Sequence, residues 1–250
     1  MKKEVMESYI KKFSLGKIIA KTKIKYDPEL KILHSRSVAD NMSFLADVIL
    51  KNFNELGSDD AVICVGDCEK FKSIISPFTD EIKLSLNFNG TILLGMNFSS
   101  DDIETYYGAS DPIAIPKTPI GLGDLGTPNV VIPFSDDFTK QFLKAKVALD
   151  ETALFSIAMN KKEKVEFVFG YLTSNSHKIR ISPPLAVINT KLSKGLQFPV
   201  TQLAEAFKMN TDMSGGELEI FEAEDGMIRL NFKSDLFECT YFQFSNTKPK

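Results

Sequence analysis

The sequence predicts an internally duplicated α+β protein of two domains, each with two helices packed on antiparallel sheets. Two stretches about 134 residues apart carry nearly the same pattern, and both contain Asn-Phe-x-Ser-Asp, beginning at Asn97 and Asn231. Each half runs in the order helix, strands, helix, strands. A segment rich in Gly and Pro separates the halves. We therefore expect domains at 1–107 and 129–250, joined by a connector at 108–128.

In the first half, apolar residues at helical spacing predict two helices. One covers 5–13, where the apolar residues from Met6 to Phe13 share one side. A strand is expected directly after it, over 17–25. The second helix is expected over 68–75 and is followed by alternating strands joined by a glycine-bearing turn.

The second half repeats this order. A helix is predicted from Asp136, which we interpret as its N-cap, to Val147, with Phe142 on its apolar face. Two strands are expected within 154–169. The last helix is expected over 200–209, again followed by strands.

Composition limits what the chain can do. With 250 residues, 43% of them hydrophobic, it is long enough for two ordinary domain cores. Its apolar runs are only a few residues long, far short of the roughly 20 needed to span a bilayer. Glu4 and Glu7 interrupt the position of a signal peptide's apolar segment, so we interpret the N-terminus as a helix of a mature, cytosolic protein. The net charge of −3 argues against bulk phosphate neutralisation, so any nucleic-acid contact is local or topological.

No residue pattern predicts catalysis, a cofactor or a metal site. Gly121-Leu-Gly-Asp-Leu-Gly has dinucleotide-binding spacing, but prolines flank it and a strand rather than a helix is expected after it. The two histidines, His34 and His177, have no nucleophile motif nearby. Cys64 and Cys68 are four apart, but no local spacing supplies the other ligands of a zinc site. We interpret the cysteines as small core residues and predict a protein that is not an enzyme.

Lysines fall on or beside all four predicted helices and would face whatever those helices face. Lys140 and Lys144 are four apart and lie opposite the apolar stripe of the third helix. A solvated helix surface is the alternative interpretation, because Glu7 and Glu205 dilute the positive charge. The connector has apolar side chains without helix or strand periodicity, which either pack on a sheet or remain available to a partner. They are Ile113, Ile115, Ile120, Leu122 and Leu125.

The duplicated order of elements, the long connector, the acidic chain and the helix lysines together resemble the DNA sliding clamps. The likeness is to the two-domain clamps, proliferating cell nuclear antigen and the tailed-phage processivity clamps. The stretch 196–220 looks like the last helix and following strand of these clamps. Cys239-Thr-Tyr-Phe-Gln-Phe resembles their closing strand, and Tyr9-Ile-Lys-Lys-Phe resembles their first helix.

The resemblance implies a head-to-tail homotrimer, in which six domains form a closed ring with helices lining the hole and sheets outside. A topological link needs only a local positive lining, while an acidic exterior avoids sticking to DNA. The candidate lining residues are Lys11, Lys12, Lys70, Lys72, Lys140, Lys144, Lys146 and Lys208. Of these, Lys12 and Lys146 lie toward the apolar flank of their helices.

The resemblance also implies a pocket beneath the connector, into which polymerase and other partners insert a short hydrophobic peptide. The matching positions are Met42, Phe44, Ile120, Leu122, Leu125, Tyr241 and Phe244. The chain departs from the cellular clamps in its longer Gly-rich connector and in Phe244-Ser-Asn-Thr, where the cellular proteins have Ala-Pro. These departures favour a viral clamp.

The function implied is that of a DNA polymerase processivity factor, which encircles double-stranded DNA without sequence preference and tethers polymerase, clamp loader and other replication proteins. It would act without cofactor or membrane, in the cytoplasm, of a host cell if phage-encoded, or in the compartment where DNA is replicated. The alternative is a monomeric clamp-like accessory factor that binds proteins and does not encircle DNA.

Overall fold

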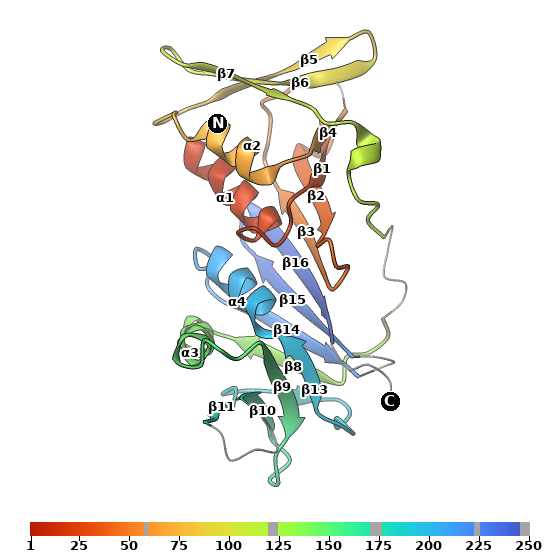
Figure 1. Ribbon diagram of the computed structural model, residues 1–250, viewed down its shortest axis with the longest axis vertical. Helices are drawn as coiled ribbons and strands as arrows, with labels where there is room; N and C mark the ends of the chain where they lie inside the picture. Colours follow the sequence, from red (N-terminus) through yellow and green to blue (C-terminus); the bar gives the residue numbers. More distant parts are fainter. Residues whose placement is uncertain (58–59, 120–124, 171–176, 223–225, 246–250) are drawn as a thin grey trace. The chain divides into compact units, whose positions relative to one another are not determined.

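The computed structural model describes residues 1–57, 60–119, 125–170, 177–222 and 226–245. The chain divides into two compact units. The first comprises Met1–Thr118 with Ser234–Cys239, and the second comprises Pro119–Lys233 with Thr240–Lys250. The described residues form four α-helices and antiparallel sheets, so the predicted α+β class is confirmed (Figure 1).

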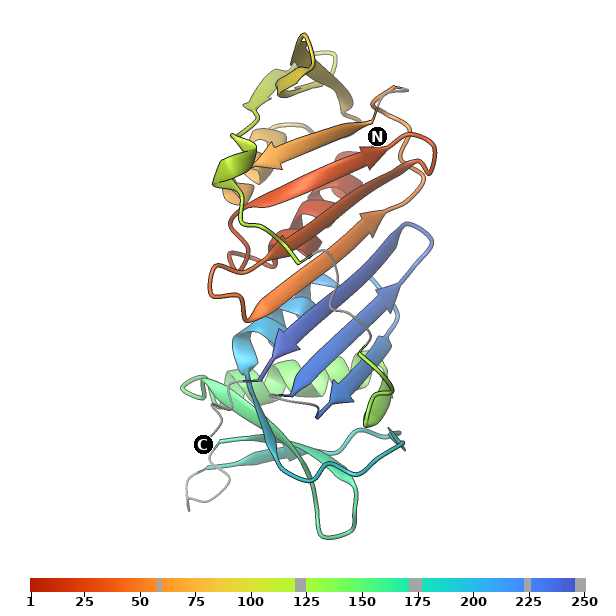
Figure 2. The same ribbon diagram turned by 90° about the vertical axis from the view of Figure 1, so that its right-hand side faces the viewer.

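The first unit contains two helices and two sheets. Its elements are α1 (Lys3–Ser14), β1 (Thr22–Asp27), β2 (Ile32–Val38), β3 (Phe44–Leu50), β4 (Ala61–Val65), α2 (Cys68–Ile75), β5 (Lys83–Asn89), β6 (Ile92–Ser99), β7 (Glu104–Gly108) and the 3-10 helix η1 (Pro112–Ala114). One sheet has the order β3-β2-β1-β4 and the other has the order β5-β6-β7. Helix α1 packs beside α2 and against β2 and β3, so the helices cover one face of the first sheet (Figure 2).

The second unit repeats this plan. Its elements are β8 (Val130–Phe134), α3 (Asp136–Ala148), β9 (Leu154–Met159), β10 (Val165–Phe169), β11 (Ile179–Ile181), β12 (Val187–Ile188), β13 (Leu196–Pro199), α4 (Val200–Met209), β14 (Gly216–Phe221), β15 (Met227–Lys233) and β16 (Phe237–Phe244), whose first residues belong to the first unit. Four strands form the sheet β11-β10-β9-β13. The other strands follow the order β12-β8-β14-β15-β16, and α3 packs beside α4.

The duplication seen in the sequence is therefore also a duplication of topology. In each unit, the strands after the first helix pair in the order third, second, first, and the strand preceding the second helix joins the outside of the first. The three strands after the second helix then form a meander, β5-β6-β7 in one unit and β14-β15-β16 in the other. Two copies of one plan put equivalent helix pairs in both units.

Two element boundaries differ from the predictions for local reasons. The strand predicted from residue 17 begins only at Thr22, because Leu15, with φ of 48°, ends α1 in a left-handed turn that continues through Gly16. The N-cap of α3 is Ser135, not Asp136. Asp136 is the first helical residue, where its carboxylate is favoured by the helix dipole.

Candidate nucleic-acid interface

In the first unit, lysines lie on the surface of the α1–α2 pair. Lys11 and Lys70 are exposed and Lys72 is half-buried. Glu7 forms ion pairs one helical turn away on each side, with Lys3 at 3.5 Å and with Lys11 at 3.8 Å. The positive charge of Lys11 is therefore partly compensated within its own helix.

In the second unit, the α3–α4 pair carries more exposed lysines than the α1–α2 pair does. Lys140 and Lys144 are exposed one turn apart on α3, and Lys146 is half-buried. On α4, the exposed Lys208 has its Nζ 3.5 Å from Glu205. The lysines of α3 are thus the strongest candidates for a phosphate contact, because the acidic residues of that helix lie in its first turn.

The assignment of Lys12 to the DNA-facing lysines is wrong. Its side chain is completely buried in the first unit, and its Nζ lies 5.1 Å from the centroid of the Phe237 ring. The contact with the aromatic ring stabilises the buried ammonium group, and its burial prevents contact with a DNA phosphate. Lys12 therefore contributes to the core.

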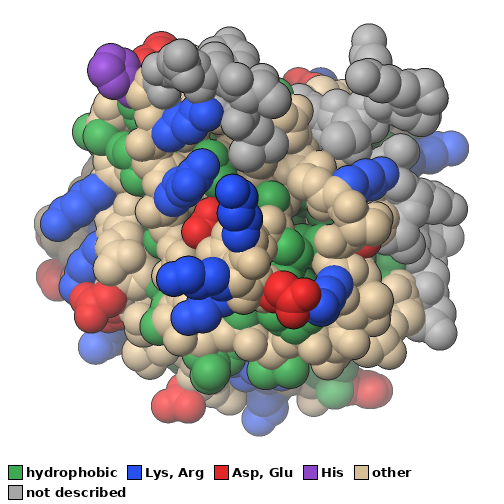
Figure 3. All heavy atoms as spheres, turned by 90° about the horizontal axis from the view of Figure 1, so that it is seen from below, with side chains coloured by type: hydrophobic (Ala, Val, Ile, Leu, Met, Phe, Trp, Pro, Cys, Tyr) green, Lys and Arg blue, Asp and Glu red, His purple; other side chains and the backbone are tan. Residues whose placement is uncertain are grey.

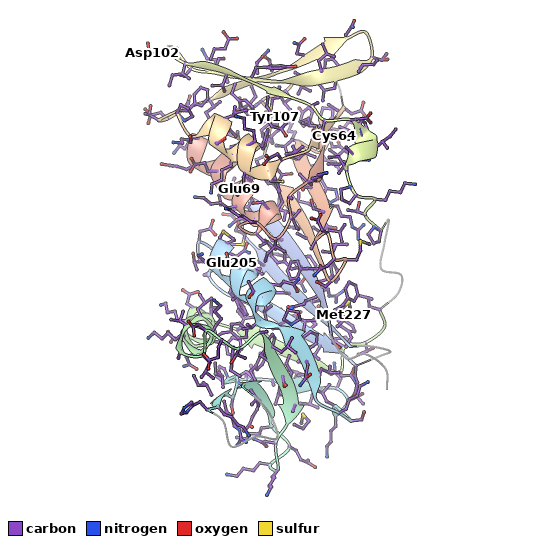
Figure 4. All side chains as sticks on the ribbon, viewed as in Figure 1. Cys64, Glu69, Asp102, Tyr107, Glu205 and Met227 are labelled. Carbon is purple, nitrogen blue, oxygen red and sulfur yellow. The ribbon has the colours of Figure 1, made fainter. Side chains whose placement is uncertain are left out.

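Acidic residues share the helices with the candidate lysines. Glu69 on α2 and Glu205 on α4 are examples (Figure 4). A positively charged surface on these helices therefore requires lysines from several helices together.

The peptide-pocket candidates separate into surface and core residues. Phe44 is completely buried and shares its strand face with Ala46 and Val48, which are also buried, so its assignment to a pocket is wrong. The assignment of Tyr241 to the pocket is also wrong, because Tyr241 is 1% exposed and its hydroxyl accepts a hydrogen bond from Asn210 Nδ2 at 3.0 Å.

Other pocket candidates remain accessible. Met42 is 53% exposed at the turn before β3 in the first unit. Leu125 and Phe244, in the second unit, are half-buried. Ile120 and Leu122 lie outside the described residues. In the connector, Ile115 is buried at 4% exposure, whereas Ile113 is 92% exposed. One apolar side chain of the connector therefore packs on the protein and another remains available to a partner.

The described part of the chain holds no group of three His, Cys, Asp or Glu side chains placed to bind a metal ion. None of its helices is long and apolar enough to cross a membrane. The three cysteines are buried and free, as expected for core residues.

Cys68 is expected to resist alkylation in the native protein. Burial, helped by the negative charges of Asp67 and Glu69, raises the pKa of the Cys68 thiol to about 12. Because the thiolate is the reactive form, iodoacetamide at about pH 8 should leave native Cys68 unmodified and should label it after unfolding. Mass mapping of the labelled peptide measures this, and equal labelling of native and unfolded protein would contradict it.

A helix pair over antiparallel sheets, repeated within one chain, defines the DNA sliding-clamp fold. Comparison with solved structures shows this fold over almost the whole chain. The chain superposes on A. fulgidus PCNA, which is bound there to the C-terminal region of FEN-1, with a TM-score of 0.72 and 18% identity, covering 100% of this chain and 98% of that one.

Two further clamps give the same result. For Proliferating Cellular Nuclear Antigen from Entamoeba histolytica, the TM-score is 0.70 at 10% identity, with 98% of this chain and 96% of that one covered. For PCNA from Thermococcus kodakaraensis, the TM-score is 0.70 at 15% identity, with 98% and 97% covered. No known family model and no curated protein matches the sequence. The likeness is therefore one of fold.

Proposed function

We propose that the protein is a DNA sliding clamp, a ring that encircles duplex DNA and tethers a polymerase without performing chemistry. The observation that carries the proposal is the clamp fold over the full length of the chain, with a lysine-bearing helix pair in each of its two units. A chain of net charge −3 can hold DNA in this way, because a closed ring does not depend on tight phosphate binding.

Free strand edges support a head-to-tail ring. In the first unit β7 is the last strand of its sheet, and in the second unit β11 is the last strand of its sheet. An edge strand presents unpaired N–H and C=O groups, which makes it a template for another chain. Pairing of β7 with β11 of the next copy is a heterologous contact, and such contacts close into a ring when the rotation allows.

The two edges also carry opposite charge. Beside β7, the side chains of Asp101, Asp102 and Glu104 are exposed (Figure 4 labels Asp102). On β11, Arg180 is exposed. The hairpin between β9 and β10 in the same unit adds the exposed Lys161, Lys162 and Lys164, and Lys and Arg side chains gather on the face in Figure 3. Complementary charge steers association and disfavours pairing of two identical edges.

Charge reversal at one edge is expected to weaken self-association. Glu104→Lys or Arg180→Glu alone should raise the apparent dissociation constant by about tenfold or more, because like charges then meet across the contact. The double variant should recover most of the loss. Sedimentation over a concentration series measures this, and a double variant no better than either single one would contradict the predicted edge pairing.

The proposal is tested by solution mass and by retention on DNA. We expect a particle three times the mass of the 27.9 kDa chain, loaded by a clamp loader onto nicked circular DNA, retained on it, and lost after the circle is linearised. A protein that stays monomeric and is retained equally on circular and linear DNA would overturn the ring and favour the monomeric accessory factor.

Partner docking belongs to the same proposal. The solved A. fulgidus PCNA is bound to the C-terminal region of FEN-1, which supports recognition of short partner segments by proteins of this fold. Of the residues that the resemblance assigns to peptide binding, Met42 in the first unit and Leu125 and Phe244 in the second unit are accessible. We place the protein in the compartment of DNA replication, and a viral origin is consistent with its connector and C-terminus.

A further inference from the structure

The outward face of β1 and β2 in the first unit carries two rows of basic side chains. Strand register places Lys23 opposite Arg36 and Lys25 opposite His34. Cross-strand partners share a face, so these four side chains lie on one side of the sheet. The intervening Ile24 is 1% exposed, because it lies on the opposite face, which the helices cover. Lys21, the residue before β1, extends the row, and we call the set Lys21, Lys23, Lys25, His34 and Arg36 the basic strip.

Three carboxylates, those of Asp27, Asp47 and Asp111, lie on the face of the basic strip. Asp47, which is opposite Arg36 on β3, has its carboxylate 2.6 Å from His34 Nε2 and 3.4 Å from Arg36 Nε. Asp111 lies on the β4 side. Burial raises the pKa of the Cys64 thiol on β4, the positive charge of Lys23 lowers it, and the negative charge of Asp111 raises it. The carboxylate of Asp111 accepts the N–H of Ile113 at 2.8 Å. Asp27 lies two residues after Lys25 on β1 and so shares its face, and its carboxylate accepts the N–H of Leu30 at 3.0 Å. Four Lys and Arg side chains and His34 therefore share this face with three carboxylates, each of which has a partner within the first unit.

The equivalent face of the second unit is not basic. There β9 and β10 take the places of β1 and β2, with Ser156 opposite Val168 and Ala158 opposite Glu166. The ring of Phe155, the residue before Ser156, packs on the Phe142 ring of α3, so Ser156 lies on the face of the sheet away from α3. Ser156 and Val168 are both buried there, at 2% and 3% exposure. Two copies of one fold thus differ at this face, and the fold itself does not require cations. Like charges opposite each other on paired strands destabilise a sheet, so the basic strip has a cost that folding does not explain.

We propose that the basic strip binds an extended acidic segment of a partner protein. Lys23 and Lys25 are two residues apart on a strand, which puts them about 7 Å apart. An extended peptide with carboxylates at alternate positions has the same repeat, so successive acidic side chains meet successive cations. Beside the strip, η1 presents Ile113 at 92% exposure, and Lys21 Nζ reaches the carbonyl of Ala114 in η1 at 3.4 Å. An apolar side chain of the partner can contact Ile113 next to its acidic run.

A peptide fits this face better than a nucleic-acid strand. Sequence-tolerant binding of single strands relies on aromatic side chains on which bases stack. The outward positions of β1 and β2 in the described chain hold Lys, His, Arg, aliphatic residues and Asp27, and no Phe, Tyr or Trp. The basic strip also lies on the face of its sheet opposite α1 and α2, whose lysines are the candidates for duplex DNA.

The test is binding of a labelled synthetic peptide in which Glu alternates with Ser, measured by fluorescence anisotropy on the full chain. We expect Lys23→Glu with Lys25→Glu to weaken binding by about tenfold or more, because two attractive pairs become repulsive. Lys191→Glu with Lys233→Glu, which makes the same change in net charge at exposed positions elsewhere, should bind as the unaltered protein does. Equal loss in both variants would overturn the proposal.

Two further measurements keep the outcome interpretable. Lys23→Glu places a carboxylate opposite Arg36, so the variant with Lys23→Glu and Lys25→Glu should melt at the same temperature as the unaltered protein or higher. If that variant does not fold, Lys23→Gln with Lys25→Gln takes its place in the binding assay. A labelled polythymidine that binds the unaltered chain more tightly than the peptide, and loses affinity in the same variant, would overturn the acidic-peptide assignment. The assay needs no ring and no DNA retention, so its failure and that of the proposed function are distinguishable.

Discussion

Replacement of Phe142 by alanine is expected to lower the free energy of unfolding of the second unit by about 3–5 kcal/mol. Phe142 is completely buried on α3. Its ring centroid lies 5.0 Å from that of Phe169, 5.1 Å from that of Phe207 and 5.3 Å from that of Phe155. Removal of the ring leaves a cavity among side chains from α3, α4 and two strands, and such a cavity collapses only partly.

The measurement must separate the two units, because a chain of two units need not unfold in one step. Hydrogen exchange followed by mass spectrometry does so, with amides of β1 and β2 reporting on the first unit. Gln141→Ala, at the exposed neighbouring position of the same helix, is the matched control and should change stability by less than about 0.5 kcal/mol. A Phe142→Ala protein with unchanged protection of β9 and β10 would contradict the predicted loss of stability in the second unit.

Reversal of two charges on α3, Lys140→Glu with Lys144→Glu, is expected to shorten retention on closed circular DNA by about tenfold or more. Both side chains are exposed and one turn apart. The plot of log affinity against log salt should lose about one unit of slope for each lysine that contacts a phosphate. Solution mass should not change, because neither residue lies at β7 or β11.

The matched control is Lys191→Glu with Lys233→Glu, which alters net charge equally away from the helices. If both variants lost retention equally, bulk charge rather than the helix lysines would govern binding. Unchanged retention in the Lys140 and Lys144 variant would favour the accessory factor that binds only proteins. Stopped-flow release from nicked circles at several salt concentrations distinguishes these outcomes.

Most of the fold could be predicted because its signals are local. Apolar residues at helical spacing predicted α1, α2, α3 and α4 within a residue or two of their bounds. The repeated Asn-Phe-x-Ser-Asp marked the same place in both units, the ends of β6 and β15. The late start of β1 was missed because the turn after α1 depends on the left-handed backbone of Leu15, which a branched apolar residue rarely signals.

The candidate site was predicted less well, because exposure is set by packing between elements distant in sequence. Lys12 was expected toward the apolar flank of its helix but still as a lining residue, and its complete burial and its contact with Phe237, at the other end of the sequence, make it core. The alternation of residues in the strands of Phe44 and Tyr241 separates the two faces of each strand, but it does not say which face is covered.

The basic strip was missed for a related reason. Lys23 and Lys25 were expected only as part of a strand, while their cross-strand partners Arg36 and His34 lie 13 and 9 positions away in the sequence. Cross-strand register alone reveals that these residues form two facing rows. Alternating Lys at positions 21, 23 and 25 was the one available signal.

The sequence by itself determined the duplication, the order of helices and strands, and the acidic balance that excludes bulk phosphate binding, because repeats, periodicity and net charge are properties of the chain alone. Tertiary structure decided which lysines meet solvent, which strands are left as sheet edges, and which charges share a face. Those properties depend on register and burial between segments far apart in the chain, and no local pattern encodes them.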